Sequence, residues 1–195
     1  MPRFQKYVKK LDQFCVVENY FTEEEVDKII DLEELQDFSQ GKVGNLEGTL
    51  NKKYRDSEIS WLFMMNESKW VFDKFTHLVG MVNHDHFMYD IDGFDAFQYT
   101  KYKPKQHYNW HFDVHVDYQT WERKISAVVL LSDPKKYGGG EFEIVNTGNI
   151  EEPLSIKPPK GSVIFFASWM PHRVAPVKSG VRKSLVAWIM GNRSC

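Results

Sequence analysis

The stretch Gln106–Asp117, with the sequence QHYNWHFDVHVD, pairs a histidine and an aspartate, His111 and Asp113, in a segment of β-forming residues. Because alternate side chains of a β-strand point to one face, we expect the odd-numbered residues from His111 to Asp117, His115 included, to share a face. The apolar Phe112, Val114 and Val116 would back that face. An imidazole and a carboxylate two residues apart supply one nitrogen and one oxygen donor to a metal ion, so the sequence predicts part of a metal site.

A second histidine ligand is best sought in the segment 161–177, GSVIFFASWMPHRVAPV. Its buried strand, Val163 to Phe166, runs into a turn that ends at Pro171, and His172 opens the next strand. A side chain at such a position can point into the mouth of a barrel. With His111 and Asp113, it would complete a 2-His-1-carboxylate triad, which is typical of non-haem Fe(II) oxygenases.

Arg182 follows His172 by ten residues. Arginine is suited to holding a carboxylate through two hydrogen bonds in a partly desolvated pocket. The sequence therefore predicts an anion-binding side chain near the metal site. On its own, Arg182 could equally be a surface ion-pair residue.

The first third of the chain predicts helices. Thr22 and Glu25 form a capping box, and an apolar stripe continues to about Gln36. A polar loop is expected over Ser39–Lys53 and a strand over Ser57–Met64. Asn66 would cap a second helix whose apolar face includes Val71, Phe75, Leu78 and Val82.

From His86 onward, short β-type runs alternate with Gly, Pro, Asn and Asp. We expect strands near 87–91, 94–102, 108–116, 124–131, 141–146, 154–156, 162–166, 172–176 and 184–190. Such spacing favours a sandwich or barrel. The predicted fold is mainly β with flanking helices: a jelly roll whose N-terminal helices pack on one sheet. We expect a single domain over 1–195, with helical support in 1–85 and a catalytic core in 86–195.

Composition excludes several classes of function. The net charge of −2 gives no signal for binding nucleic acid, and no apolar run is long enough to span a bilayer. Cys15 and Cys195 form no metal or disulfide motif and fit a reducing compartment. The N-terminus lacks the apolar core of a signal peptide. We therefore expect a soluble, cytoplasmic protein with no nucleic-acid or membrane partner.

Several ordered motifs between Phe94 and Gly191 carry a family resemblance. They are Tyr102 with Gln106-x-Tyr108-x-x-His111-Phe112-Asp113, Gly139-Gly140-Glu141, Pro171-His172-Arg173-Val174, and Gly180-x-Arg182-x-Ser184. The set resembles the Fe(II)- and 2-oxoglutarate-dependent dioxygenases, and within them the prolyl 4-hydroxylase branch, especially the PKHD-type hydroxylases of bacteria and phages. This resemblance implies a double-stranded β-helix, the cupin-like form of the jelly roll.

The resemblance also implies roles for individual residues. His111, Asp113 and His172 would bind Fe(II), and Arg182 would hold the distal carboxylate of 2-oxoglutarate with help from Tyr102 and Ser184. Dioxygen would be the second cosubstrate and ascorbate the reductant. Oxidative decarboxylation to succinate and CO2 would drive hydroxylation of an unactivated C–H, with a proline-containing peptide or protein as the leading substrate.

Other functions stay open from the sequence alone. The same chemistry could act on a free amino acid or another small metabolite. A catalytically silent jelly-roll binding module belongs to a different class, and the intact triad argues against it. Nucleic-acid demethylation is disfavoured by the net acidity, and a zinc hydrolase would leave Arg182 without a partner.

Overall fold

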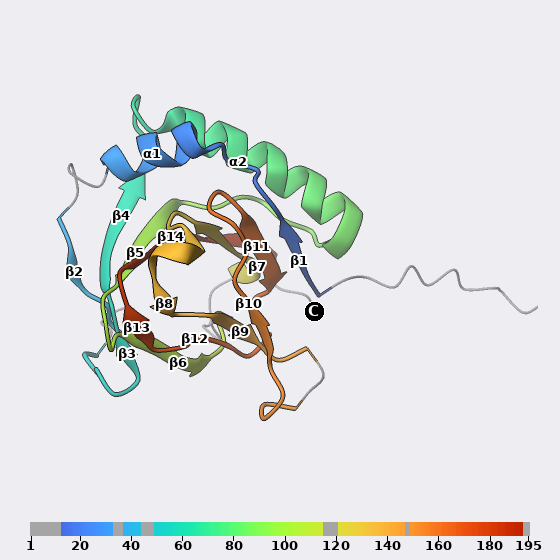
Figure 1. The fold of residues 1–195 in the computed structure, drawn as a ribbon. Helices are drawn as coiled ribbons and strands as arrows, with labels where there is room; N and C mark the ends of the chain where they lie inside the picture. The colour runs from blue at the N-terminus through green and yellow to red at the C-terminus, as the bar shows by residue number, and fades with distance from the viewer. Residues whose placement is uncertain (1–12, 33–36, 44–48, 115–120, 147–148, 193–195) are drawn as a thin grey trace, which may run out of the picture.

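Two antiparallel sheets enclose the interior of the computed structural model, which describes residues 13–32, 37–43, 49–114, 121–146 and 149–192 (Figure 1). The first part of the chain contains β1 (Phe14–Val17), α1 (Glu23–Asp31), β2 (Ser39–Gln40), β3 (Arg55–Asp56), β4 (Glu58–Phe63), α2 (Lys69–Val82) and the π-helical turn η2 (Asn83–Phe87). The second part contains β5 (Ala96–Tyr102), β6 (His107–His111), β7 (Trp121–Leu130), the 3-10 turn η3 (Pro134–Lys136), β8 (Gly138–Gly139), β9 (Phe142–Ile144), β10 (Leu154–Ile156), β11 (Val163–Ala167), β12 (His172–Val174), β13 (Val177–Ser179) and β14 (Arg182–Asn192).

The larger sheet has seven strands in the order β1-β11-β7-β14-β5-β4-β2, and the smaller has five in the order β10-β9-β12-β6-β3. Strands β13 and β8 form a separate pair. The two main sheets curve toward each other around a common interior, as Figure 1 shows end-on. This arrangement confirms the predicted jelly roll with helices on one sheet.

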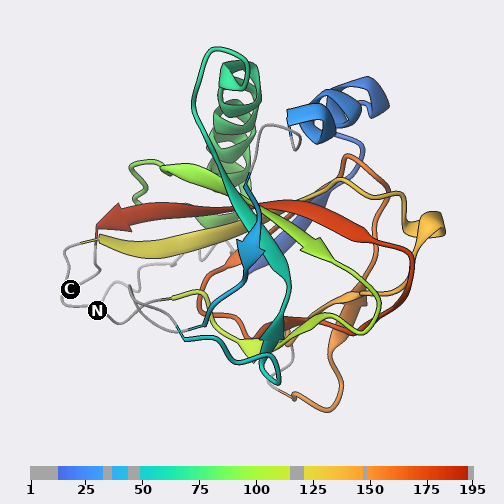
Figure 2. The same cartoon turned by 90° about the vertical axis from the view of Figure 1, so that its left-hand side faces the viewer.

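Both helices cover the outer face of the larger sheet (Figures 1 and 2). The predicted capping box of α1 is present: Thr22 accepts a hydrogen bond from the Glu25 backbone, and Glu25 accepts one from the Thr22 backbone. The predicted apolar face of α2 is buried. Its Phe75 ring lies 4.9 Å from the Phe97 ring of β5, so aromatic packing joins helix and sheet.

Strands β5 and β14 divide their side chains between two environments. Phe97 of β5 belongs to the core cluster that includes the helices, whereas Gln98, Thr100 and Tyr102 line a pocket inside the barrel. On β14, Arg182, Ser184, Val186 and Trp188 line the same pocket. The alternation follows from the two-residue period of a strand, and it gives the barrel a polar interior at one place.

The structure refines three predictions for the first part of the chain. The first helix, α1, ends at Asp31, and residues 33–36 of its predicted extension to about Gln36 lie outside the described residues. Asn66 does not cap α2, because the N-cap is Ser68, whose hydroxyl accepts a hydrogen bond from the Met65 backbone in the preceding turn. The loop expected over Ser39–Lys53 contains the two-residue strand β2.

The strand expected at 87–91 is absent. The helical conformation there continues from α2 through η2 and ends at the C-cap residue Met88, which has a left-handed φ of 54°. The Asn83 side chain then bonds both the N–H and the carbonyl of Tyr89. These bonds occupy backbone groups that a strand would have used for pairing, so the prediction was wrong for a local reason.

The strand expected at 108–116 is shorter than predicted, since β6 ends at His111. Asp113 therefore follows the strand and does not share its face. Phe112 is 59% exposed, so it does not form a buried apolar face behind the candidate ligands. His115, Val116 and Asp117 lie outside the described residues.

Candidate active site

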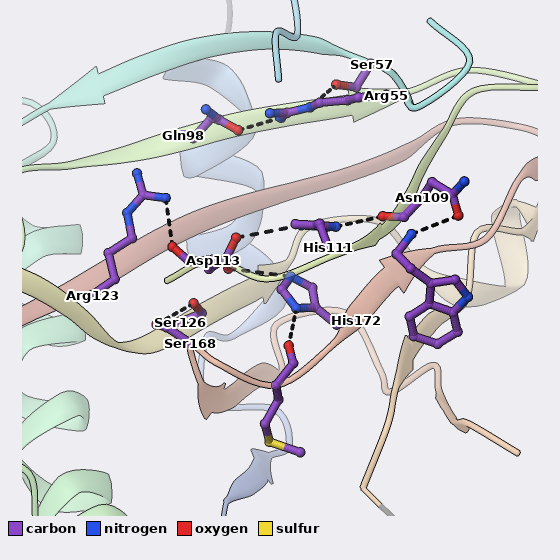
Figure 3. A network of polar contacts seen from close by, with 12 residues as sticks. Arg55, Ser57, Gln98, Asn109, His111, Asp113, Arg123, Ser126, Ser168 and His172 are labelled. Atoms are coloured by element: carbon purple, nitrogen blue, oxygen red, sulfur yellow. Dashed lines mark hydrogen bonds and ion pairs between the residues drawn. The ribbon is translucent and has the colours of Figure 1, made fainter. Parts of the chain in front are cut away.

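The structure brings His111, Asp113 and His172 together from two strands and a loop (Figure 3). His111 ends β6, His172 begins β12, and the two residues are paired in the sheet register with ring centroids 4.1 Å apart. Asp113 is held beside them by its backbone N–H, which donates to the Ser168 carbonyl at 2.9 Å. Potential ligand atoms of the three residues lie within 4.8 Å of one another, the one such group found among the described residues.

Both histidines direct Nε2 toward the aspartate. The Nδ1 atom of His111 lies 2.7 Å from the Asn109 carbonyl, and Nδ1 of His172 lies 2.9 Å from the Met170 carbonyl. Because a carbonyl oxygen only accepts, each Nδ1 carries a proton, and a neutral ring leaves Nε2 without one. These Nε2 atoms are 3.7 and 3.5 Å from the Asp113 carboxylate oxygens.

His111 and Asp113 have the protonation states that metal ligands require. Burial, with His172 adding to it, lowers the pKa of His111 to about 3, so its ring is neutral near pH 7. Burial opposes ionisation of Asp113, but His172, His111, Arg123 and a hydrogen bond from Ser126 hold the pKa of its carboxyl at about 2. The anionic carboxylate of Asp113 repels the unprotonated Nε2 of His111 unless a cation lies between them. The donor set therefore fits a divalent metal.

Arg182 lines a narrow inner pocket that the three residues of the triad also line. Arg182 is 1% exposed, its Nη1 donates to the Ser184 hydroxyl at 3.1 Å, and its side chain is also hydrogen-bonded to Tyr137. Nε and Nη2 are buried with no hydrogen-bond partner among the described residues. A buried guanidinium with unmatched donors is costly unless an anion occupies the pocket.

Two more polar groups in this pocket lack partners within the described chain. They are the Thr100 hydroxyl and the indole N–H of Trp188. Together with Arg182 they offer donors along the inner pocket, from the triad to the guanidinium. This distribution fits a ligand with a carboxylate at its far end and oxygen atoms near the metal, as 2-oxoglutarate has.

The other predicted pocket residues lie beside Arg182. Tyr102 faces Arg182 across the β5–β14 pairing, and its ring centroid is 5.6 Å from the guanidinium carbon. Gly140 leaves room for the arginine stem: its φ is +65°, and a β-carbon there would lie 3.2 Å from Arg182 Cδ. Arg182, Tyr102 and Ser184 are thus adjacent, as expected.

An outer cleft of about 990 Å³ opens over His111 and Asp113. Six residues line both the cleft and the inner pocket: Arg55, Gln98, Tyr108, His111, Asp113 and Trp188. The rim of the cleft includes exposed apolar side chains, namely Leu50, Trp61, Phe112 and Ile150. The site therefore has a narrow inner compartment and a wide outer one that meet at the candidate metal ligands.

Reasoning from the sequence missed Thr100, Trp188, Arg55 and Arg123 as site residues. Thr100 and Trp188 could have been found from the alternation on β5 and β14, since they share a strand face with Tyr102 and Ser184. Arg123 contacts the Asp113 carbonyl at 3.4 Å and packs 4.0 Å from the Trp188 ring centroid. No local pattern indicates Arg55, which reaches the site from the two-residue strand β3.

Comparison with known proteins agrees with this geometry. The pattern of the 2OG-Fe(II) oxygenase superfamily matches residues 97–190. Residues 97–190, just under half of the chain, are therefore similar in sequence to that superfamily. Over 96 residues the chain is 34% identical to a PKHD-type hydroxylase of Crocosphaera subtropica, covering 48% of this chain and 42% of the relative. Over 97 residues it is 33% identical to one from Pseudoalteromonas atlantica, covering 47% and 41%. The aligned part thus spans less than half the length of these curated relatives.

Solved structures share the fold over most of the chain. A prolyl hydroxylase from Trichoplax adhaerens, in complex with a hypoxia inducible factor peptide fragment, superposes with a TM-score of 0.74 at 19% identity, covering 91% of this chain and 83% of that one. The viral collagen prolyl hydroxylase of Paramecium Bursaria Chlorella virus-1, as its 2OG complex, gives a TM-score of 0.69 at 25% identity, covering 92% and 97%. The oxygenase superfamily and the His-Asp-His cluster together support Fe(II) and 2-oxoglutarate as cofactors.

The described helices include no membrane span. None of them is both long enough and apolar enough to cross a bilayer.

Proposed function

We propose that the protein is an Fe(II)- and 2-oxoglutarate-dependent dioxygenase that hydroxylates a prolyl residue in a peptide or protein, with release of succinate and CO2. One observation carries the proposal: the anionic Asp113 carboxylate faces the Nε2 atoms of two imidazoles, and a buried guanidinium with two unpartnered donors among the described residues lines the same pocket. The first arrangement fits a divalent cation, and the second fits a carboxylate.

Each residue then has a defined task. His111, Asp113 and His172 would hold Fe(II), and Arg182 would bind the distal carboxylate of 2-oxoglutarate. Tyr102 and Ser184 would keep the guanidinium oriented, since one packs against it and the other accepts its Nη1 hydrogen bond. When bound, the metal and 2-oxoglutarate supply the oxidative decarboxylation that activates O2. The aromatic walls exclude water from this reaction.

The outer cleft favours a peptide over a free amino acid. Its volume of about 990 Å³ is far larger than one amino acid needs, and exposed apolar side chains continue along the rim. The structural relatives named above are prolyl hydroxylases, one of them in complex with a peptide. A hydroxylase of a free amino acid or small metabolite is the alternative within the same chemistry.

Three further expectations belong to the same proposal. Ascorbate would serve as the reductant that keeps the metal ferrous. Residues 1–195 would act as a single catalytic domain, in which 1–85 supports the core at 86–195. The protein would work in the cytoplasm.

The test uses purified protein with Fe(II), 2-oxoglutarate and ascorbate, incubated with a library of proline-containing peptides and, separately, with free proline. We expect peptides to gain one oxygen atom, with about one succinate formed for each hydroxylation, and no gain when 2-oxoglutarate is omitted. Hydroxylation of free proline alone would favour the small-metabolite alternative. No succinate from protein shown to bind iron would favour a silent binding module.

A further inference from the structure

Arg55 is a buried arginine without an acidic partner. Its side chain is 7% exposed, and among the described residues no carboxylate forms an ion pair with it. The guanidinium donates instead to neutral acceptors: Ser57 Oγ at 3.0 Å and Gln98 Oε1 at 2.7 Å, both drawn in Figure 3, and the Lys42 carbonyl at 3.2 Å. Burying a cation among neutral groups costs free energy, so this position calls for a reason beyond stability.

The guanidinium packs on the ring of Tyr108, with its central carbon 4.5 Å from the ring centroid. Tyr108 in turn stacks on the imidazole of His111 at 3.5 Å between centroids and 13° between planes. An imidazole this close covers one face of the phenol ring, which leaves the opposite face for the guanidinium. Tyr108 is therefore held between a fixed cation and a candidate metal ligand.

The backbone supports this stack. Strand β3 pairs with β6 so that Arg55 lies opposite Tyr108 in the register. Gly41 leaves space for the guanidinium, since a β-carbon there would lie 2.8 Å from Arg55 Nε and also collide with the Ser57 hydroxyl. The stack is thus built from two strands, β3 and β6, that are far apart in the sequence, and Gly41 leaves the space for it.

We propose that Arg55 is a positioning residue for the metal ligand His111 and acts through Tyr108. The hydrogen bond from Nδ1 to the Asn109 carbonyl fixes one point of the imidazole, but the ring can still turn about that direction. Tyr108 removes this freedom when Arg55 holds it from behind. His111 Nε2 is then aimed at the metal before the metal arrives, which lowers the entropic cost of binding.

The test measures metal affinity and not catalysis. Co(II) serves as the probe, because its d–d absorption reports the ligand geometry. We expect Arg55→Met and Tyr108→Leu each to weaken Co(II) binding by roughly 10- to 100-fold, the usual effect of losing a group that orients a ligand, and to alter the d–d bands. Tyr108→Phe keeps the stacked ring and should bind Co(II) within about threefold of wild type.

Arg173→Met is the matched control. Arg173 also lies over an aromatic ring, 4.8 Å from the Trp110 centroid, and is paired with Glu143, but it does not contact the stack. It should bind Co(II) within about threefold of wild type. Thermal unfolding and near-ultraviolet circular dichroism identify variants that fold. If Arg55→Met does not fold, Tyr108→Leu still tests the stack with Arg55 in place.

The inference rests on the proposed metal centre, and the two can fail separately. Wild-type protein that binds no Co(II) would contradict the metal centre itself. The role of Arg55 alone would be overturned by a different result: the wild type binds Co(II), and folded Arg55→Met and Tyr108→Leu bind it with the same affinity and the same spectra.

Discussion

His172 lies opposite His111 where β12 pairs with β6, although 61 positions separate the two residues in the sequence. Each Nδ1 donates to a carbonyl of its own chain segment, from Asn109 or Met170, so both Nε2 atoms point to one carboxylate. The site is therefore arranged for a cation by backbone geometry before any ion binds.

Replacing the candidate carboxylate ligand should remove metal binding without removing the fold. Asp113→Asn keeps the shape of the side chain but loses its charge. We expect Co(II) affinity to fall by more than about 100-fold, beyond the loss of an outer contact. Titration followed by absorption checks this, with Asp133→Asn as a control at an aspartate outside the site. Retained affinity in Asp113→Asn would remove the residue from the ligand set.

Arg182→Ala should chiefly weaken 2-oxoglutarate binding. It deletes a charge-assisted contact of about 1.5–3 kcal/mol, which corresponds to roughly 10- to 150-fold in affinity. Arg182→Lys keeps the charge but loses the two-pronged geometry, so we expect an intermediate loss. The measurement is thermal stabilisation of Co(II)-loaded protein by 2-oxoglutarate, with Arg173→Met as control. An unchanged concentration dependence would place the carboxylate contact elsewhere.

Thr100→Val should have opposite effects on the free and the ligand-bound protein. Without 2-oxoglutarate the change removes a buried hydroxyl that has no partner among the described residues, so the free energy of unfolding should rise by about 1 kcal/mol. With 2-oxoglutarate the stabilisation should be smaller than in wild type.

Ser60→Ala is the control for Thr100→Val, because Ser60 also has an unpartnered buried hydroxyl in this structure but does not line the inner pocket. It should stabilise the free protein and leave the effect of 2-oxoglutarate unchanged. Equal loss of ligand stabilisation in both variants would rule out a specific role for Thr100.

Phe112→Ser should impair a peptide substrate and spare the cosubstrates. Phe112 is 59% exposed on the cleft rim, and loss of about 1 kcal/mol of apolar contact would raise the KM for peptide roughly fivefold. Succinate release without peptide should not change. Phe63→Ser is the control, since Phe63 is 58% exposed but does not line the cleft. Equal effects of the two variants would argue against peptide contact at Phe112.

The candidate ligands could be predicted from the sequence because His111, Asp113, His172 and Arg182 are residue types with specific chemistry at readable spacings. The capping box at Thr22 was equally readable, since its partners are local. Asp113 shows where the pattern misleads. Periodicity predicts that it lies on a strand, whereas in the structure it follows the strand and its backbone N–H donates a hydrogen bond to the Ser168 carbonyl. This hydrogen bond joins segments that are distant in the sequence, so no local pattern indicates it.

Arg55 shows what a single sequence leaves out. Its strand has two residues, too few for any periodic pattern, and its role depends on pairing with Tyr108, 53 positions away. Thr100 differs, because it lies on a strand whose alternating faces were readable. Whether its hydroxyl has a hydrogen-bond partner depends on the neighbouring strand β14, and the sequence does not show that pairing.

The wall common to the outer cleft and the inner pocket limits how this protein could be engineered. A substitution at Gln98, Tyr108 or Trp188 would change the chamber for the substrate and the chamber for the cosubstrate together. Libraries that seek a new substrate should therefore vary rim positions such as Leu50 and Ile150, which line the cleft alone. When proteins with this scaffold evolve new substrates, we expect the rim residues to change first and the residues of the shared wall to change last.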